Sequence, residues 1–88
     1  MTKQPATPQT LDELTTILES GICPCCHTPA IATDLSGTTE GLEDLRSLFP
    51  GVPENHIRPG TENTVYLECD RHRWELYYSV ESGFSAEG

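Results

Sequence analysis

The sequence predicts a small α+β domain with two short helices and a C-terminal β-hairpin. Three observations support this prediction. Apolar residues recur at helical spacing over residues 11–20 and 40–49. They alternate with polar residues over 64–80, as in paired strands. Cysteine and histidine residues form one pair within 23–26 and another within 69–72, at positions where the chain is expected to turn.

The composition is that of an acidic chain with little material for a core. Only 35% of the residues are hydrophobic, and 14 acidic residues against 5 basic ones give a formal net charge of −9. A core this small predicts an additional stabilising group. The acidity argues against general nucleic-acid coating, which depends on clustered Lys and Arg. With no membrane span or hydrophobic leader in the 88 residues, we expect one cytoplasmic domain over residues 10–80.

The N-terminal part predicts an arm followed by a helix. Residues 1–9 contain two prolines and no apolar run, which predicts a disordered arm. Thr10 opens the segment TLDE, a capping box in which Thr10 and Glu13 satisfy each other's backbone donors. The helix predicted over 11–20 ends at Gly21, because glycine readily adopts the left-handed conformation that stops a helix.

A second helix is predicted over residues 40–49, with Thr39 as its N-cap. A brief strand over 30–33 and a turn over 34–37 are expected before it. The prolines and glycines of residues 50–63 predict a loop after it.

The last third of the chain predicts the hairpin. The alternating positions are Val65, Leu67 and Cys69 in the first strand, and Trp74, Leu76, Tyr78 and Val80 in the second. The residues between the strands, 69–72, suffice only for a tight turn. Residues 81–88 predict a flexible tail.

The cysteines are considered as metal ligands first, because disulfides are rare in a reducing cytoplasm. Two residues separate Cys23 from Cys26, and two separate Cys69 from His72. This spacing lets a tight turn direct both donors at one ion, and tetrahedral zinc accepts three thiolates with one imidazole. The sequence therefore predicts one structural Zn²⁺ bound by these four residues. The histidine and the hairpin favour zinc over an iron–sulfur cluster.

The segments CPCCH at 23–27 and CDRH at 69–72 resemble the two knuckles of a zinc ribbon. The resemblance covers residues 22–33 and 64–80. It implies a zinc-ribbon-like fold, rich in β-hairpins, around one structural zinc. It implies no particular function, because zinc ribbons serve as nucleic-acid binders, docking modules and enzyme appendages.

Three further residues near or outside the knuckles need an interpretation. Cys25 is expected to be a spare, exposed thiol. His27 occupies a position that is commonly glycine in such knuckles, and it is the alternative imidazole ligand to His72. His56, in the predicted loop, is expected to be an ordinary loop histidine.

The functional expectation is a binding protein and not an enzyme. Four protein ligands leave zinc no open position, and no catalytic constellation is visible. Glu40, Glu43 and Asp44 predict an acidic surface for a protein partner with a basic surface. This describes a small regulator, such as a phage- or plasmid-type accessory protein that inhibits its target as a nucleic-acid-mimicking decoy.

The alternative function is a nucleic-acid-binding zinc ribbon of the transcription- or translation-factor type. Arg71 and Arg73 flank a predicted ligand, and Trp74 and Tyr77 lie close enough for stacking. The alternation of the strand nevertheless favours Trp74 as a core residue.

Overall fold

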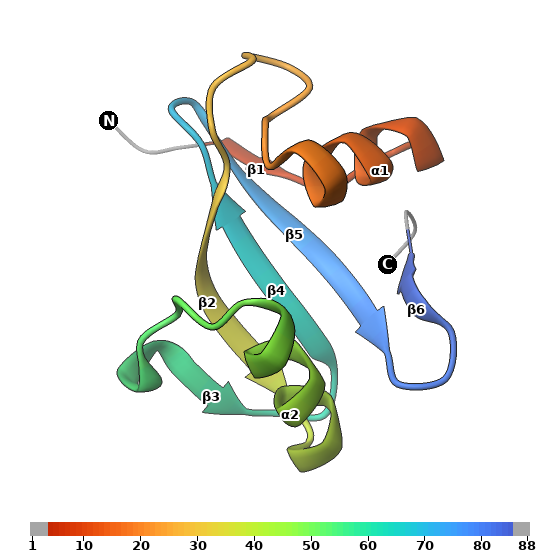
Figure 1. Cartoon of the computed structure of the whole chain (residues 1–88), viewed down its shortest axis with the longest axis vertical. Coiled ribbons are helices and arrows are strands. Elements are labelled where there is room, and N and C mark those ends of the chain that lie inside the picture. The colour runs from red at the N-terminus through yellow and green to blue at the C-terminus, as the bar shows by residue number, and fades with distance from the viewer. Residues whose placement is uncertain (1–3, 86–88) are drawn as a thin grey trace.

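The computed structural model describes residues 4–85, and it has the mixed α+β character that the sequence predicts. Two helices of ten residues each, α1 (Leu11–Ser20) and α2 (Thr39–Leu48), accompany one β-sheet (Figure 1). Neither of these helices is long and apolar enough to cross a membrane.

The sheet of the described residues has three long central strands and three short ones at its edges. The strands are β1 (Gln4–Ala6), β2 (Ile31–Gly37), β3 (Ile57–Pro59), β4 (Asn63–Glu68), β5 (His72–Ser79) and β6 (Gly83–Ser85). β2, β4 and β5 pair antiparallel, and β4 with β5 forms the predicted hairpin. β3 pairs in parallel with β2, whereas β1 and β6 both pair with the outer edge of β5.

One face of the sheet carries the hydrophobic core. The strand registers place Leu35 beside Val65, and Leu67 beside Trp74, so that all four buried side chains project from the same face. Both helices contribute to this same core, through Leu14, Ile17 and Leu45.

The first helix has the predicted bounds and the predicted caps. The Thr10 hydroxyl accepts a hydrogen bond from the Glu13 backbone N–H at 3.1 Å. Gly21 ends the helix in the left-handed conformation, with φ of 68°. The Thr10 N-cap and the glycine stop are therefore confirmed. The Glu13 carboxylate accepts from the Thr10 hydroxyl at 3.3 Å and not from the Thr10 backbone N–H, so only half of the predicted capping box is present.

The second helix is confirmed, but its N-cap is Thr38 and not Thr39. The Thr38 hydroxyl accepts from the Gly41 N–H at 3.1 Å, and the Thr38 N–H donates to Asn63 Oδ1 at 2.9 Å. A Cβ atom at Gly41 would lie 2.0 Å from that same amide oxygen. Asn63 thus fixes the start of α2 from a distant strand, and it requires glycine at position 41.

Two predictions between the helices and the hairpin are wrong. The turn expected over 34–37 is part of strand β2, because burial of Leu35 and pairing with β4 keep the chain extended there. The loop expected over 50–63 contains the short 3₁₀ helix Glu54–His56 and strand β3. Parallel pairing with the outer edge of β2 orders this segment.

The ends of the described chain also differ from expectation. Residues 4–6, expected in a disordered arm, form β1 along β5, and Pro8 is fully buried. Residues 83–85, expected in a flexible tail, form β6. Both strands satisfy backbone groups on an exposed sheet edge. They extend the sheet beyond the predicted 10–80 domain, while residues 1–3 and 86–88 lie outside the described part.

Candidate metal centre

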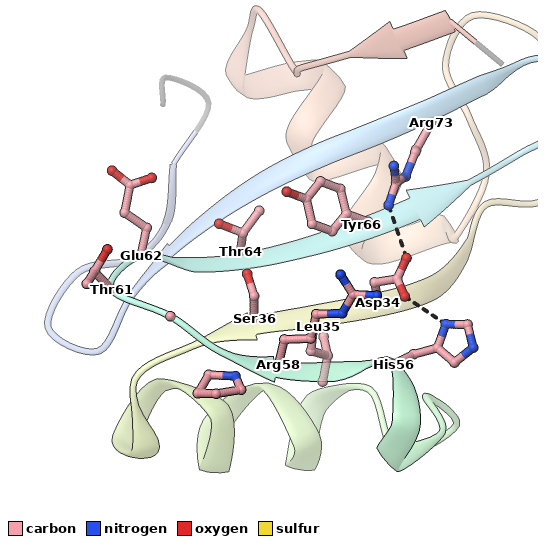
Figure 2. A pocket seen from close by; sticks show the side chains of 12 residues that line it. Asp34, Leu35, Ser36, His56, Arg58, Thr61, Glu62, Thr64, Tyr66 and Arg73 are labelled. Atoms are coloured by element: carbon pink, nitrogen blue, oxygen red, sulfur yellow. Dashed lines mark hydrogen bonds and ion pairs between the residues drawn. The ribbon is translucent and has the colours of Figure 1, made fainter. Parts of the chain in front are cut away.

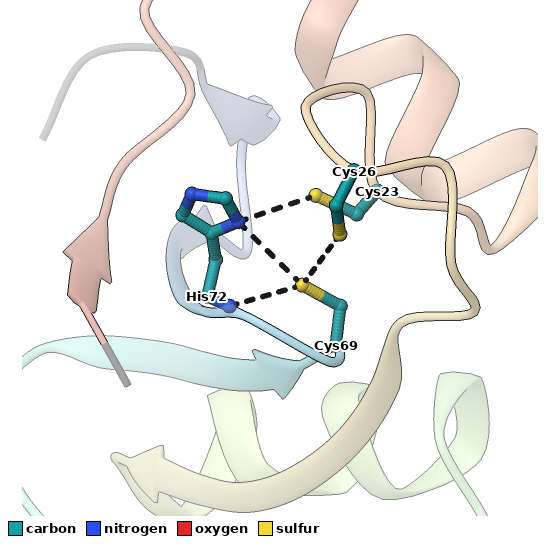
Figure 3. Close-up of side chains that lie close together, drawn as sticks. All are labelled: Cys23, Cys26, Cys69 and His72. Carbon is teal, nitrogen blue, oxygen red and sulfur yellow. Dashed lines mark hydrogen bonds between the residues drawn. The ribbon is translucent and has the colours of Figure 1, made fainter. Parts of the chain in front are cut away.

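The two predicted ligand pairs meet at one end of the sheet (Figure 3). Cys23 and Cys26 lie in the loop that follows α1. Cys69 lies in the turn between β4 and β5, and His72 is the first residue of β5. One donor atom from each residue lies within 4.8 Å of all the others. These four residues form a site that could bind a metal ion.

The separations of the donor atoms suit a tetrahedral ion. The Sγ atoms of Cys26 and Cys69 lie 3.3 Å apart. The Sγ atoms of Cys23 and Cys69 each lie 3.8 Å from His72 Nδ1. A tetrahedral zinc with Zn–S of about 2.3 Å and Zn–N of about 2.0–2.1 Å would have donors about 3.5–3.8 Å apart. The four donors are therefore already close to a coordinating arrangement.

Backbone amides hold the sulfur atoms in the two turns. The Cys25 N–H donates to Cys23 Sγ at 3.4 Å, and the His72 N–H donates to Cys69 Sγ at 3.1 Å. The His27 N–H donates to the Cys23 carbonyl oxygen at 2.9 Å, which closes the first turn. Such amide contacts favour sulfur in its thiolate form.

His27 and Cys25 lie in the same turn as Cys23 and Cys26, but they do not belong to the four candidate ligands. His27 has a φ of 60°, the left-handed conformation that favours glycine. Its side chain is exposed and does not belong to the group of four. Cys25 is a free, exposed thiol, in agreement with the expectation for the spare cysteine.

Trp74 connects the candidate site to the core. Its indole Nε1–H donates to Cys23 Sγ at 3.2 Å, and the two side chains are 2% and 0% exposed. The sequence predicted Trp74 as a core residue but not this contact. The sequence did contain an indication of this contact. Trp74 comes two residues after His72, so that both side chains lie on the same face of β5.

Thr28 is a residue of the candidate site that the sequence reasoning missed. Its hydroxyl lies 2.9 Å from Cys26 Sγ and accepts from the Asp70 N–H at 3.2 Å, so that it bridges the two turns. Hydrogen bonds, of which donation by this hydroxyl is the largest, lower the pKa of the Cys26 thiol to about 5. Burial raises the pKa of the neighbouring Cys69 thiol. Of this pair, Cys26 therefore loses its proton first.

The predicted acidic residues lie on α2, away from this site. Glu40 and Glu43 are exposed, and neither forms an ion pair within residues 4–85. Asp44 is half-buried, and its carboxylate accepts a hydrogen bond from the Tyr78 hydroxyl at 2.9 Å. Asp44 thus contributes to packing between α2 and β5.

The two arginines of the alternative function do not act together. Arg71 is exposed in the turn. Arg73 projects from the sheet face opposite to Trp74, where its guanidinium forms an ion pair with Asp34 at 3.0 Å and lies 4.4 Å from the centre of the Tyr66 ring.

Fold and site define a small α+β protein with a candidate three-cysteine, one-histidine metal centre. Searches of family models, characterised proteins and solved structures find no match to this chain. The resemblance to zinc ribbons therefore rests on the two knuckles and their hairpin.

Proposed function

We propose that this chain is a zinc-stabilised protein-interaction module, a small regulator whose acidic helix α2 binds a basic surface of a partner protein. The observation that carries the proposal is the pair of exposed carboxylates, Glu40 and Glu43, on a helix of a chain with formal net charge −9. Carboxylates without internal cation partners are available to a basic partner.

Zinc suits the donor set better than other ions do. Thiolates with imidazole select soft or borderline metals, and tetrahedral separations favour zinc. Four protein donors complete the coordination of zinc, which supports a structural role and not a catalytic one. Cys23 and Cys69 are buried, so that water has little access to their sulfur atoms.

An apolar area at the C-terminal end of α2 adds to the proposed binding surface. Leu48 and Ile31 are 53% and 67% exposed, and they border a groove of about 260 Å³. Phe49 and Val52 line the same groove. A basic partner that also brings an apolar side chain would find both kinds of contact near one helix.

The nucleic-acid alternative has less support. Trp74 is buried against Cys23 and is not available for stacking on a base. Arg73 is already paired with Asp34. Of the two arginines predicted for this function, only Arg71 stays unpaired in the described residues, and one cation does not match the row of phosphates along a nucleic-acid backbone.

The proposal is tested with charge reversals at two places. A protein captured from the host with the intact chain is identified and purified, and its affinity is measured against variants. Glu40→Lys with Glu43→Lys should weaken binding by tenfold or more and reduce its dependence on salt. The matched control, Glu19→Lys with Glu81→Lys, makes the same change in net charge at exposed acids outside α2 and should bind almost normally.

Asp44 is left unchanged in this test, because its contact with Tyr78 belongs to the fold. Equal weakening by the α2 reversals and by the control would show a general charge effect and refute the assignment. Binding of mixed DNA or RNA that is lost in Arg71→Ala would favour the nucleic-acid alternative instead.

A further inference from the structure

The face of the sheet opposite to the core contains a polar depression of about 490 Å³ (Figure 2). It lies where β3, β2 and β4 run side by side. Arg58 pairs with Ser36 across β3 and β2, and Ser36 pairs with Thr64 across β2 and β4. Their side chains therefore form a row on this face, which is the face that Leu35 does not use.

Asp34 lies at one end of the depression, with His56 and Arg73 beside it (Figure 2), and next to an irregularity in the register of β2. Its Oδ1 accepts from His56 Nδ1 at 2.8 Å, and its Oδ2 accepts from Arg73 Nη2 at 3.0 Å. Because a carboxylate can only accept, the hydrogen of His56 lies on Nδ1. Both oxygens of this carboxylate thus have partners from the protein, and His56 is not the ordinary loop histidine that the sequence suggested.

Four other donors that line the depression have no partner from the described part of the protein. Within residues 4–85, Arg58 forms no ion pair, and the hydroxyls of Ser36, Thr64 and Tyr66 form no hydrogen bond. All four side chains line the same depression, and Thr64 is only 5% exposed. The depression therefore offers one guanidinium and three hydroxyls to a ligand that accepts hydrogen bonds.

The charges around the depression limit the size of that ligand. Glu62 lies at the rim, and its carboxylate points away from Arg58 (Figure 2). Glu75 lies beside Tyr66 on the neighbouring strand. A long polyanion would pass close to these carboxylates and be repelled, whereas a compact anion would not reach them.

We propose that this depression binds a small oxyanion, the phosphate or carboxylate group of a low-molecular-mass ligand. Arg58 supplies the charge, since a guanidinium fork matches the geometry of both groups. Ser36, Thr64 and Tyr66 supply hydroxyl donors. Asp34 orients Arg73 and His56 at the edge of the site. This proposal is independent of the partner surface on α2.

The test follows backbone amide resonances of the ¹⁵N-labelled, metal-loaded full chain. Inorganic phosphate and acetate are each titrated against sodium chloride at matched ionic strength. We expect saturable shifts at residues 34–36, 58 and 64–66 with at least one of the two anions, and the tighter anion identifies the group that the site prefers. Arg58→Gln should weaken this binding about tenfold or more, because a charge-assisted hydrogen bond is lost.

Arg46→Gln is the matched control. It removes the same charge from an exposed arginine on α2 that pairs with Glu54, outside the depression. It should leave the affinity within about twofold of the original. Shifts that rise linearly with both anions, or equal weakening by Arg58→Gln and Arg46→Gln, would overturn the proposal. Tighter binding of a single-stranded oligonucleotide on the same face would overturn it as well.

Discussion

Replacement of Trp74 by phenylalanine tests whether the indole contact to Cys23 stabilises the protein. Trp74→Phe removes the hydrogen bond from Nε1–H to Cys23 Sγ, which is 3.2 Å long and buried. A hydrogen bond to a charged group contributes about 1.5–3 kcal/mol, and we take the lower end because sulfur is a weak acceptor. The smaller ring also leaves about 40 Å³ unfilled, at a cost of about 1 kcal/mol. The expected loss in the free energy of unfolding is about 2.5 kcal/mol.

The control for this substitution is Leu76→Val, on the same face of the same strand. Leu76 is fully buried, and loss of one methylene there should cost about 1 kcal/mol without removing a hydrogen bond. Both zinc-loaded variants are unfolded with urea and followed by circular dichroism. Fluorescence is unsuitable because Trp74 is the only tryptophan. If Trp74→Phe costs no more than Leu76→Val, the indole hydrogen bond contributes nothing and the reasoning is wrong.

Three further outcomes are expected. Cys26→Ser should lose zinc and most of its stability, whereas Cys25→Ser should keep one zinc per chain by native mass spectrometry and melt normally; loss of zinc from Cys25→Ser would mean that the ligands are wrongly assigned. Thr28→Val should raise the pH at which acid releases zinc, measured with a chromogenic chelator. The reason is that hydrogen bonds lower the pKa of Cys26 from 9.0 to about 5, and the bond from the Thr28 hydroxyl is the largest of them. The stabilisation that they give is fully present above 9.0 and is lost as the pH falls through about 5, so a variant without the hydroxyl should lose it at a higher pH. An unchanged release pH would contradict that role. Deletion of residues 1–9 should lower the free energy of unfolding by about 2 kcal/mol or more, because it removes β1 and the buried Pro8. An unchanged melting temperature would show that these residues add no stability, as a disordered arm would.

The structure could be predicted from the sequence wherever residues close together in the chain determine it. The hydroxyl cap at Thr10 and the glycine at position 21 fix α1 within its own segment. The alternation over residues 64–80 fixes the hairpin in the same way. The two ligand pairs were recognisable because each spacing belongs to one tight turn. Each pair supplies only two of the four ligands of a tetrahedral site. The sequence therefore also predicted that the two pairs come together.

The sequence was insufficient where the decisive partner lies far along the chain. β1 and β3 are three-residue strands that contain proline, and only the neighbouring edges of β5 and β2 make them strands. From its local sequence Asp34 was expected in a turn. Its partners, His56 and Arg73, come from distant segments and could not be recognised from the sequence. Thr28 has no recognisable spacing, since its role depends on the approach of Asp70 from the second turn.

The meeting of the two turns also has a consequence for the unfolded chain. An ion held by both turns would close a loop over the 42 residues between Cys26 and Cys69. In polymer terms this is a crosslink, and closing a loop of that length removes chain entropy equivalent to about 4 kcal/mol at 25 °C. A disulfide at the same place would have a similar effect but would be broken by cellular reductants. A zinc crosslink tolerates reductants and depends on free-metal concentration instead, so the lifetime of this protein would follow the zinc supply of its surroundings.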